Sequence, residues 1–284
     1  MANQFNIDYE TFKAVCPSGT QPDDRPVPFA VGCCRSGFAY CPWSFAGPAF
    51  SDITSVLSDE SGVADPCRTA YMSAVRYICN RAYADTIPHL DLVLTSTGFG
   101  VVSNANVAPA SRDRVDRLLG RLEAAASDAM DDLILSLRYF DSWRETCQAD
   151  ECISSLFWLA RHLRRIGLHG ATRDNLDRVR PQISQAEAEL AALISPEMLA
   201  AVIDSQRYPS PPGRLMADLQ RMCRNYVGAA VDGKPDRMVF GRSILRFLCA
   251  NIGDFPEFAA SGEYAAITSE KYENQADDPC FFFA

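Results

Sequence analysis

Apolar residues recur every three or four positions over most of this chain, which is the period of amphipathic α-helices. The longest such pattern starts after Ser111, a residue type typical of helix N-caps, and continues to Phe140. It predicts one helix of about eight turns, roughly 45 Å long. The same pattern predicts further helices at residues 66–84, 151–166, 175–194, 196–206, 215–231 and 237–251, with a short one after Pro256.

A different pattern precedes the long helix. Two short apolar segments, Leu90–Leu94 and Val101–Val102, flank the turn-forming string Thr95–Gly100. Short extended segments around glycines are typical of a β-hairpin, so we expect a small β insertion at residues 90–104. The predicted fold class is therefore mainly α, a helical bundle of about seven helices with a small β-hairpin insertion.

Both ends of the chain lack helical periodicity. Residues 1–60 contain six prolines but are dense in aromatic residues, which predicts an extended, irregular N-terminal arm packed against its own subunit or a neighbouring copy. Residues 61–260 form the predicted helical body. Residues 261–284 carry one Lys and five acids, a net charge of −4, and predict an extended acidic C-terminal tail.

Composition excludes some classes of protein. A net charge of −9 and a pI near 4.9 argue against a dedicated nucleic-acid-binding protein, which usually has a basic face. Eleven cysteines, an odd number spread over 284 residues, do not form a disulfide framework. Neither a signal-peptide pattern nor an apolar run of about 18 residues is present, so we expect a soluble protein in a reducing cytoplasm and no membrane partner.

Several strings resemble a family of virion proteins carried by tailed phages and prophages of anaerobic gut bacteria, among their head and head–tail-joining genes. The resembling strings are Leu92–Thr95, Thr97–Asn104, Ala108–Ser111, Arg114–Val115, Lys271–Asn274 and the terminal phenylalanines. The resemblance implies a phage structural protein, a head–tail connector or head-completion adaptor at the portal–tail junction. It implies a homo-oligomeric ring of about twelve copies, with portal and tail or neck proteins as partners.

The same resemblance implies a location in the virion after assembly in the host bacterial cytoplasm, with DNA only as passing cargo. It supplies no catalytic, metal or cofactor residue, and we expect no enzymatic activity. Three alternatives stay open: another virion role such as a tail terminator or minor capsid protein, an assembly chaperone, and a small cytosolic helical metal-dependent enzyme.

The residues expected to contact other subunits or the portal lie in two places. Three phenylalanines end the acidic tail, and burying each is worth about 1.5–3 kcal/mol, so we expect them to dock on another subunit or fold back on their own core. Arginines cluster at the start of the long helix, where solvated surface, a protein interface and DNA contact are all possible. The predicted interaction residues are Phe281, Phe282, Phe283, Tyr272, Phe99, Arg112, Arg114 and Arg117.

Two clusters of polar residues could carry chemistry. Asp128, Asp131 and Asp132 share one face of the long helix and could bind Mg²⁺ or act as acid and base, but a solvated helix face is the favoured interpretation. Cysteines and histidines at positions 147, 152, 162 and 169 are spaced too widely for a usual zinc site. We therefore expect no metal and no cofactor.

Overall fold

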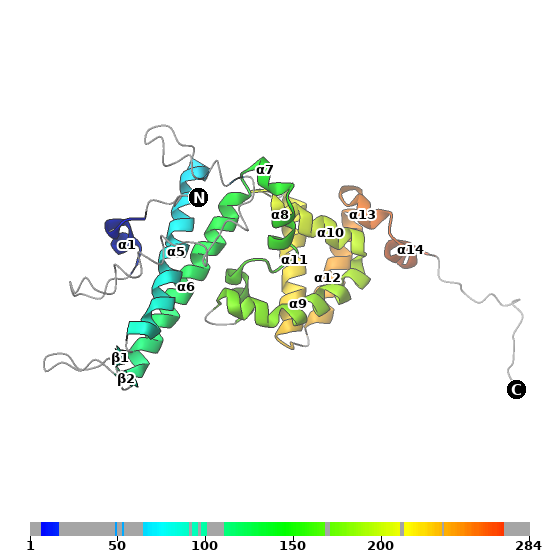
Figure 1. Ribbon diagram of the computed structural model, residues 1–284. Coiled ribbons are helices and arrows are strands. Elements are labelled where there is room, and N and C mark those ends of the chain that lie inside the picture. The colour runs from blue at the N-terminus through cyan, green and yellow to red at the C-terminus, as the bar shows by residue number, and fades with distance from the viewer. Residues whose placement is uncertain are drawn as a thin grey trace, which may run out of the picture.

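The computed structural model describes residues 7–16, 49, 53, 65–90, 93–95, 98–100, 111–167, 171–210, 213–234 and 236–269. Helices dominate this part of the chain, so the fold class is mainly α (Figure 1). The principal helices are α1 (Tyr9–Val15), α5 (Asp65–Leu90), α6 (Arg112–Leu137), α7 (Asp141–Arg144), α8 (Cys147–Cys152), α9 (Arg173–Ile194), α10 (Pro196–Asp204), α11 (Arg214–Val231), α12 (Arg237–Ala250), α13 (Pro256–Ala259) and α14 (Gly262–Thr268). Short 3-10 helices are η3 (Ala160–Ile166), η4 (Ser205–Arg207) and η5 (Ile252–Asp254).

The two longest helices, α5 and α6, lie side by side and run in opposite directions (Figure 1). Along α6 the buried residues Leu122, Ala126, Met130, Leu133 and Leu137 recur every three or four positions, as an amphipathic helix requires. The helix predicted after Ser111 is confirmed, although it ends at Leu137 and not at Phe140. We call this unit the α5–α6 pair.

The buried apolar residues form two main cores. The first joins the α5–α6 pair to α1, α7 and α8 and includes Phe12 and Trp143. The second joins the helices from α9 to α13, which together with α14 we call the C-terminal bundle. Side chains cap several of its helices: Thr172, Ser195 and Ser261 accept hydrogen bonds from the backbone N–H groups at the starts of α9, α10 and α14. The single helical body predicted at residues 61–260 thus has two centres of packing.

The predicted β insertion is reduced to two very short strands. β1 (Val93–Thr95) pairs antiparallel with β2 (Gly98–Gly100), and Leu94 lies opposite Phe99. The apolar segment Val101–Val102, expected as the second strand, lies outside the described residues. Two strands of three residues each are too short to form an inserted β unit, so the fold class is mainly α.

The chain ends are more helical than expected wherever they are described. α1 lies within the predicted irregular arm, because Asp8 caps its start and Phe12 is buried in the first core. α14 lies within the predicted extended tail, because Ser261 caps it and Tyr264 packs on the second core. The loss of periodicity therefore placed the ends of the helical body too close to its centre, since α1 and α14 are helices that pack on it.

One predicted helix is wrong. Residues 151–166 were expected to be helical, but α8 ends at Cys152 and only a 3-10 helix follows, from Ala160. Between them the chain is irregular and mostly buried. We call residues 153–166 the junction segment, because it connects the two cores.

The helix α9 continues through Pro181 without a break. Leu176, Ile183 and Leu190 are buried in one core and hold both halves of the helix in line.

Candidate functional site

Asp131, a member of the predicted carboxylate cluster, is fully buried in the middle of α6. Its two oxygens accept hydrogen bonds from the backbone N–H groups of Ala160, at 3.1 Å, and Arg161, at 2.8 Å. The Arg161 guanidinium pairs with the same carboxylate at 3.3 Å. Asp131 therefore caps the start of η3, where unsatisfied N–H groups favour an anion.

The other two carboxylates of the cluster also bind arginines of the chain itself. Asp132 pairs with Arg161 and, at 3.7 Å, with Arg76 of α5, while Asp128 pairs with Arg164. The expected solvated face is therefore wrong for Asp131, which is buried, whereas Asp128 and Asp132 are partly exposed and bind arginines. In the part of the chain that the structure describes, no His, Cys, Asp and Glu side chains are grouped to hold a metal ion.

A second buried carboxylate holds the junction segment from the opposite side. Glu187 of α9 accepts hydrogen bonds from the hydroxyl of Ser155 and the backbone N–H of Leu156, both at 2.7 Å. Burial raises the pKa of the Glu187 carboxyl above its ordinary value, although these two hydrogen bonds and the charge of Arg180 act in the other direction. The non-helical backbone is thus satisfied by side chains instead of by helical hydrogen bonds.

Further polar groups of the C-terminal bundle complete this attachment. Gln206 accepts hydrogen bonds from Trp158 Nε1 at 3.0 Å and from Arg224 at 2.6 Å, and donates to the carbonyl of Ser155. Arg173, at the start of α9, donates to the carbonyl of Trp158 at 3.0 Å. The junction segment is therefore bound by side chains of α6, α9, η4 and α11.

Cys152 and His162, near this segment, are buried and serve packing. The His162 ring is buried edge-on against Phe157 and Trp158, at centroid distances of 6.1 and 5.7 Å. Cys152 is buried, and desolvation raises the pKa of its thiol to about 11, which keeps it protonated and unreactive at neutral pH. Cys147 is exposed on α8. His169 lies outside the described residues, and the His89 side chain is not described.

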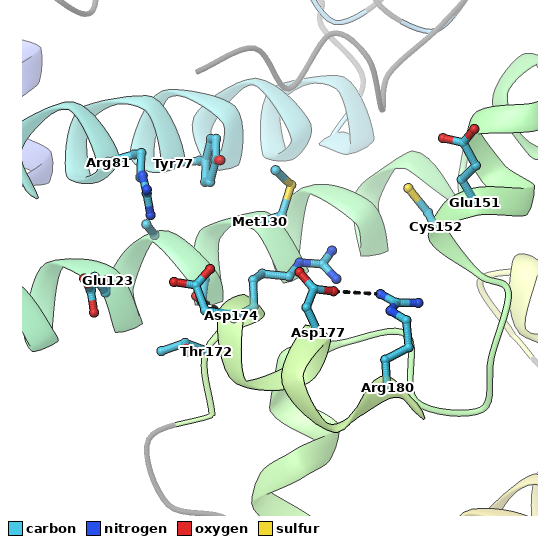
Figure 2. A pocket seen from close by; sticks show the side chains of 13 residues that line it. Tyr77, Arg81, Glu123, Met130, Glu151, Cys152, Thr172, Asp174, Asp177 and Arg180 are labelled. Atoms are coloured by element: carbon cyan, nitrogen blue, oxygen red, sulfur yellow. Dashed lines mark hydrogen bonds and ion pairs between the residues drawn. The ribbon is translucent and has the colours of Figure 1, made fainter. Parts of the chain in front are cut away.

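A cavity of about 280 Å³ lies beside the junction, between the α5–α6 pair, α8 and the start of α9 (Figure 2). Its lining carries charges of both signs, and Arg180 pairs there with Asp177 at 3.0 Å. Desolvation raises the pKa of the Tyr77 phenol, so it stays protonated at neutral pH. The lining residues include Tyr77, Arg81, Glu123, Met130, Glu151, Cys152, Thr172, Arg173, Asp174, Asp177 and Arg180.

The predicted interaction arginines lie in the first turns of α6, at the end of the α5–α6 pair that points away from the C-terminal bundle (Figure 1). Arg112 is 94% exposed and pairs at 3.7 Å with Asp116, and Arg117 pairs with Asp113. Arg114 is exposed as well. We call this end of the pair the arginine tip. Its i,i+4 ion pairs are solvent-exposed and leave all three guanidiniums accessible to a partner.

The remaining predicted interaction residues cannot be placed. Phe99 lies in β2, beside the arginine tip, but its side chain is not described. Tyr272 and the three terminal phenylalanines lie outside the described residues. The expected docking of the phenylalanines therefore remains a prediction.

Sequence reasoning missed the residues that hold the junction segment. Glu187 occupies a helix position between apolar residues, Ala186 and Leu190, and this apolar setting was the available signal that it is buried. Gln206 carries no such signal, because it ends a short helix before the turn-forming string Tyr208–Gly213. Its role follows only from the packing of η4 against the junction segment.

Comparison with known protein families gives a match that ends where the junction segment begins. Residues 54–153 match a family of unknown function (DUF6712). No curated protein and no solved structure matches the chain. The matched stretch includes α5, α6, α7 and α8 and ends where the junction segment begins, so the similarity covers the α5–α6 pair and leaves the C-terminal bundle outside.

Proposed function

We propose that this chain is a structural protein of a tailed-phage virion, a head–tail connector or head-completion subunit that forms a ring at the portal–tail junction. In such a ring the helical body forms the wall, and segments at its ends contact neighbouring copies, the portal, and tail or neck proteins. DNA is passing cargo and meets only surface charge. No helix among the described residues is both long enough and apolar enough to cross a membrane.

The observation that carries this proposal is where the resembling sequence lies in space. The strings around residues 92–115 resemble virion proteins, and the described part of them includes β1, β2 and the arginine tip, at one exposed end of the α5–α6 pair (Figure 1). Arginine is enriched at protein interfaces, because its planar guanidinium donates several hydrogen bonds at once. A rigid helical pair with arginines at its end suits a subunit that contacts another protein.

The enzyme alternative depended on the carboxylates of α6. Asp128, Asp131 and Asp132 bind Arg164, Arg161 and backbone N–H groups of η3, so each carboxylate already has partners within the chain. This arrangement favours a structural role for the cluster over metal-dependent chemistry.

The proposal is tested by locating the chain in assembled particles. We expect mass spectrometry of purified virions to detect it, and a cryo-electron-microscopy map to place a ring of it between portal and tail. Absence from finished particles would favour an assembly chaperone, and a position elsewhere would favour another virion role. Either result would overturn the connector proposal.

Deletion of Pro279–Ala284 tests the contribution of the terminal phenylalanines. The two described cores are built from residues between Ile7 and Tyr264, so we expect the truncated chain to fold with an unchanged helical circular dichroism spectrum. We expect it to fail to assemble into particles. Normal particle assembly by the truncated chain would reject a docking role for this segment.

A further inference from the structure

The helix α12 buries one side and leaves the other uncovered. Gly241, Ile244 and Leu248 are buried, and a Cβ at Gly241 would lie only 3.0 Å from Leu193 of α9. On the opposite side Met238 and Val239 are each 61% exposed, the largest exposed fractions among the large apolar residues that the structure describes. The exposed residues, which we call the α12 outer face, are Met238, Val239, Arg242, Ser243 and Arg246.

The α12 outer face is basic as well as apolar. Arg242 and Arg246 lie one helical turn apart, and no carboxylate of the described residues pairs with either, whereas Arg237 on the same helix binds Glu189 at 2.7 Å. Residues 214–250 contain seven Lys and Arg and three Asp, a net charge of +4, in a chain whose net charge is −9. An apolar pair beside two unpaired cations suits an acidic segment that carries large apolar side chains.

The C-terminal segment of this chain has that chemistry. Asp277 and Asp278 precede Phe281, Phe282 and Phe283. We propose that the α12 outer face binds residues 270–284 of a neighbouring copy, with the two aspartates on Arg242 and Arg246 and the phenylalanines on Met238 and Val239. This inference rests on the proposed function, because the contact that it describes joins two subunits of the proposed ring.

Order and spacing agree with this arrangement. When α12 is followed from its C-terminal end, the two arginines come before the two apolar residues, just as the aspartates come before the phenylalanines. From Arg246 to Met238 the helix rises by about 12 Å. An extended strand covers about 13 Å from Asp278 to Phe282. Both halves of the segment can therefore contact the face at once.

The proposed contact also gives copies of the chain a way to close into the proposed ring. It joins two different surfaces of the same chain, the α12 outer face and the C-terminal segment, so each copy offers one of each. Such a head-to-tail contact repeats from copy to copy and closes when the rotation per subunit allows it. Residues 270–284 can span about 50 Å when extended, several times the diameter of a helix.

Photo-crosslinking in the full-length chain tests the contact. Phe282 is replaced by the photoreactive p-benzoylphenylalanine, and isotopically light and heavy copies are mixed, crosslinked and digested. We expect mass spectrometry to find position 282 joined to residues 238–246, in products that combine a light and a heavy chain. Crosslinks to other surfaces only, or to α12 within a single chain, would overturn the inference.

Charge-reversal variants distinguish a specific contact from non-specific binding. We expect Arg242→Glu with Arg246→Glu to lower the yield of this crosslink about tenfold, and Asp277→Arg with Asp278→Arg in the same chain to restore it. Arg68→Glu with Arg178→Glu, which changes two exposed arginines outside residues 214–250, is the matched control and should leave the yield unchanged. An unchanged yield in the α12 variant, or no rescue, would contradict the contact. The connector proposal is judged separately, by the position of the chain in virions.

Discussion

The α5–α6 pair and the C-terminal bundle both bury apolar residues, but they treat buried polar groups differently. In the pair, the side chains of Asn80, Thr86 and Ser136 donate hydrogen bonds to carbonyls four residues earlier in their own helix. In the bundle, Glu187 and Gln206 bind groups 31 to 51 residues away in sequence. These polar side chains of the pair are therefore satisfied within their own helix, whereas Glu187 and Gln206 of the bundle are satisfied by the distant junction segment.

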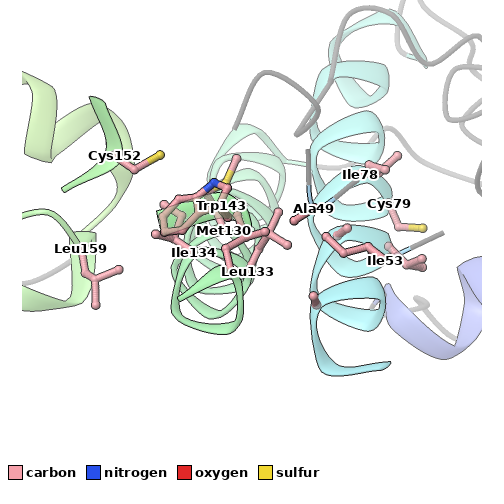
Figure 3. Packing of buried hydrophobic residues seen from close by; sticks show 14 of the residues in the cluster. Ala49, Ile53, Ile78, Cys79, Met130, Leu133, Ile134, Trp143, Cys152 and Leu159 are labelled. Carbon is pink, nitrogen blue, oxygen red and sulfur yellow. The ribbon is translucent and has the colours of Figure 1, made fainter. Parts of the chain in front are cut away.

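The exception in the pair is the place where the two regions meet. Asp131 lies on α6 but binds Ala160 and Arg161 of the junction segment. Figure 3 shows the apolar counterpart of this attachment: Leu133 and Ile134 of α6 lie between α5 on one side and the segment with Cys152 and Leu159 on the other. A long helix thus acts as a common support for both regions. The buried carboxylate of Asp131, together with Asp128 and Asp132, makes the polar part of the connection.

The largest expected effect comes from breaking that connection. Asp131→Ala removes the acceptor for two backbone N–H groups and for Arg161, so we expect the free energy of unfolding to fall by about 3 kcal/mol. The matched control is Asp128→Ala, where a carboxylate that is 37% exposed pairs with Arg164, and we expect a loss of only about 0.5 kcal/mol. Guanidinium denaturation followed by circular dichroism measures both. Equal effects of the two variants would show that Asp131 is no more important than a surface ion pair.

Leucine substitutions at two glycines compare how tightly the bundle and the α5–α6 pair are packed. Gly241 of α12 lies against Leu193 and Tyr226, so Gly241→Leu overpacks the bundle, and we expect a loss of about 2 kcal/mol. Gly120 of α6 has no other atom within 4 Å of its added Cβ, so Gly120→Leu should stabilise the helix by about 0.5 kcal/mol. Thermal unfolding of the two variants checks these opposite signs. A destabilised Gly120→Leu variant would mean that the exposed side of α6 is covered in solution.

The smallest effect concerns the pH dependence of the bundle. The pKa of Glu187 is raised in the folded chain, so its contribution to stability is fully present below its ordinary pKa, near 4.5, and is lost as pH rises through the folded value. Glu187→Gln removes this dependence but keeps an oxygen that accepts hydrogen bonds from Ser155 and Leu156. We therefore expect the stability of the variant relative to wild type to increase between about pH 4 and pH 7. Urea titrations across that range measure the difference, and a constant or falling difference would contradict the burial effect.

Local pattern predicted much of the α5–α6 pair and part of the bundle. The long helix and the helix that starts at Pro196 follow from periodicity and capping, which act over a few positions. The N-terminal arginines of α6 were also predicted to be available to a partner, and they are exposed. The contact itself remains a prediction.

Long-range contacts decided the rest. Residues 153–159 have apolar spacing that suits a helix, but Glu187 binds the backbone N–H of Leu156, and Asp131 binds that of Ala160 directly after them. No pattern within the segment contains that information. Asp128, Asp131 and Asp132 resemble a solvated face when α6 is considered alone. When η3 packs against α6, the three carboxylates bind its arginines and so connect the two elements. The sequence by itself determined most of the longer helices and which of their sides are apolar, because these depend on neighbours within one or two turns. Only the tertiary structure decided which polar side chains are buried, because that depends on groups some 30 positions away in the chain.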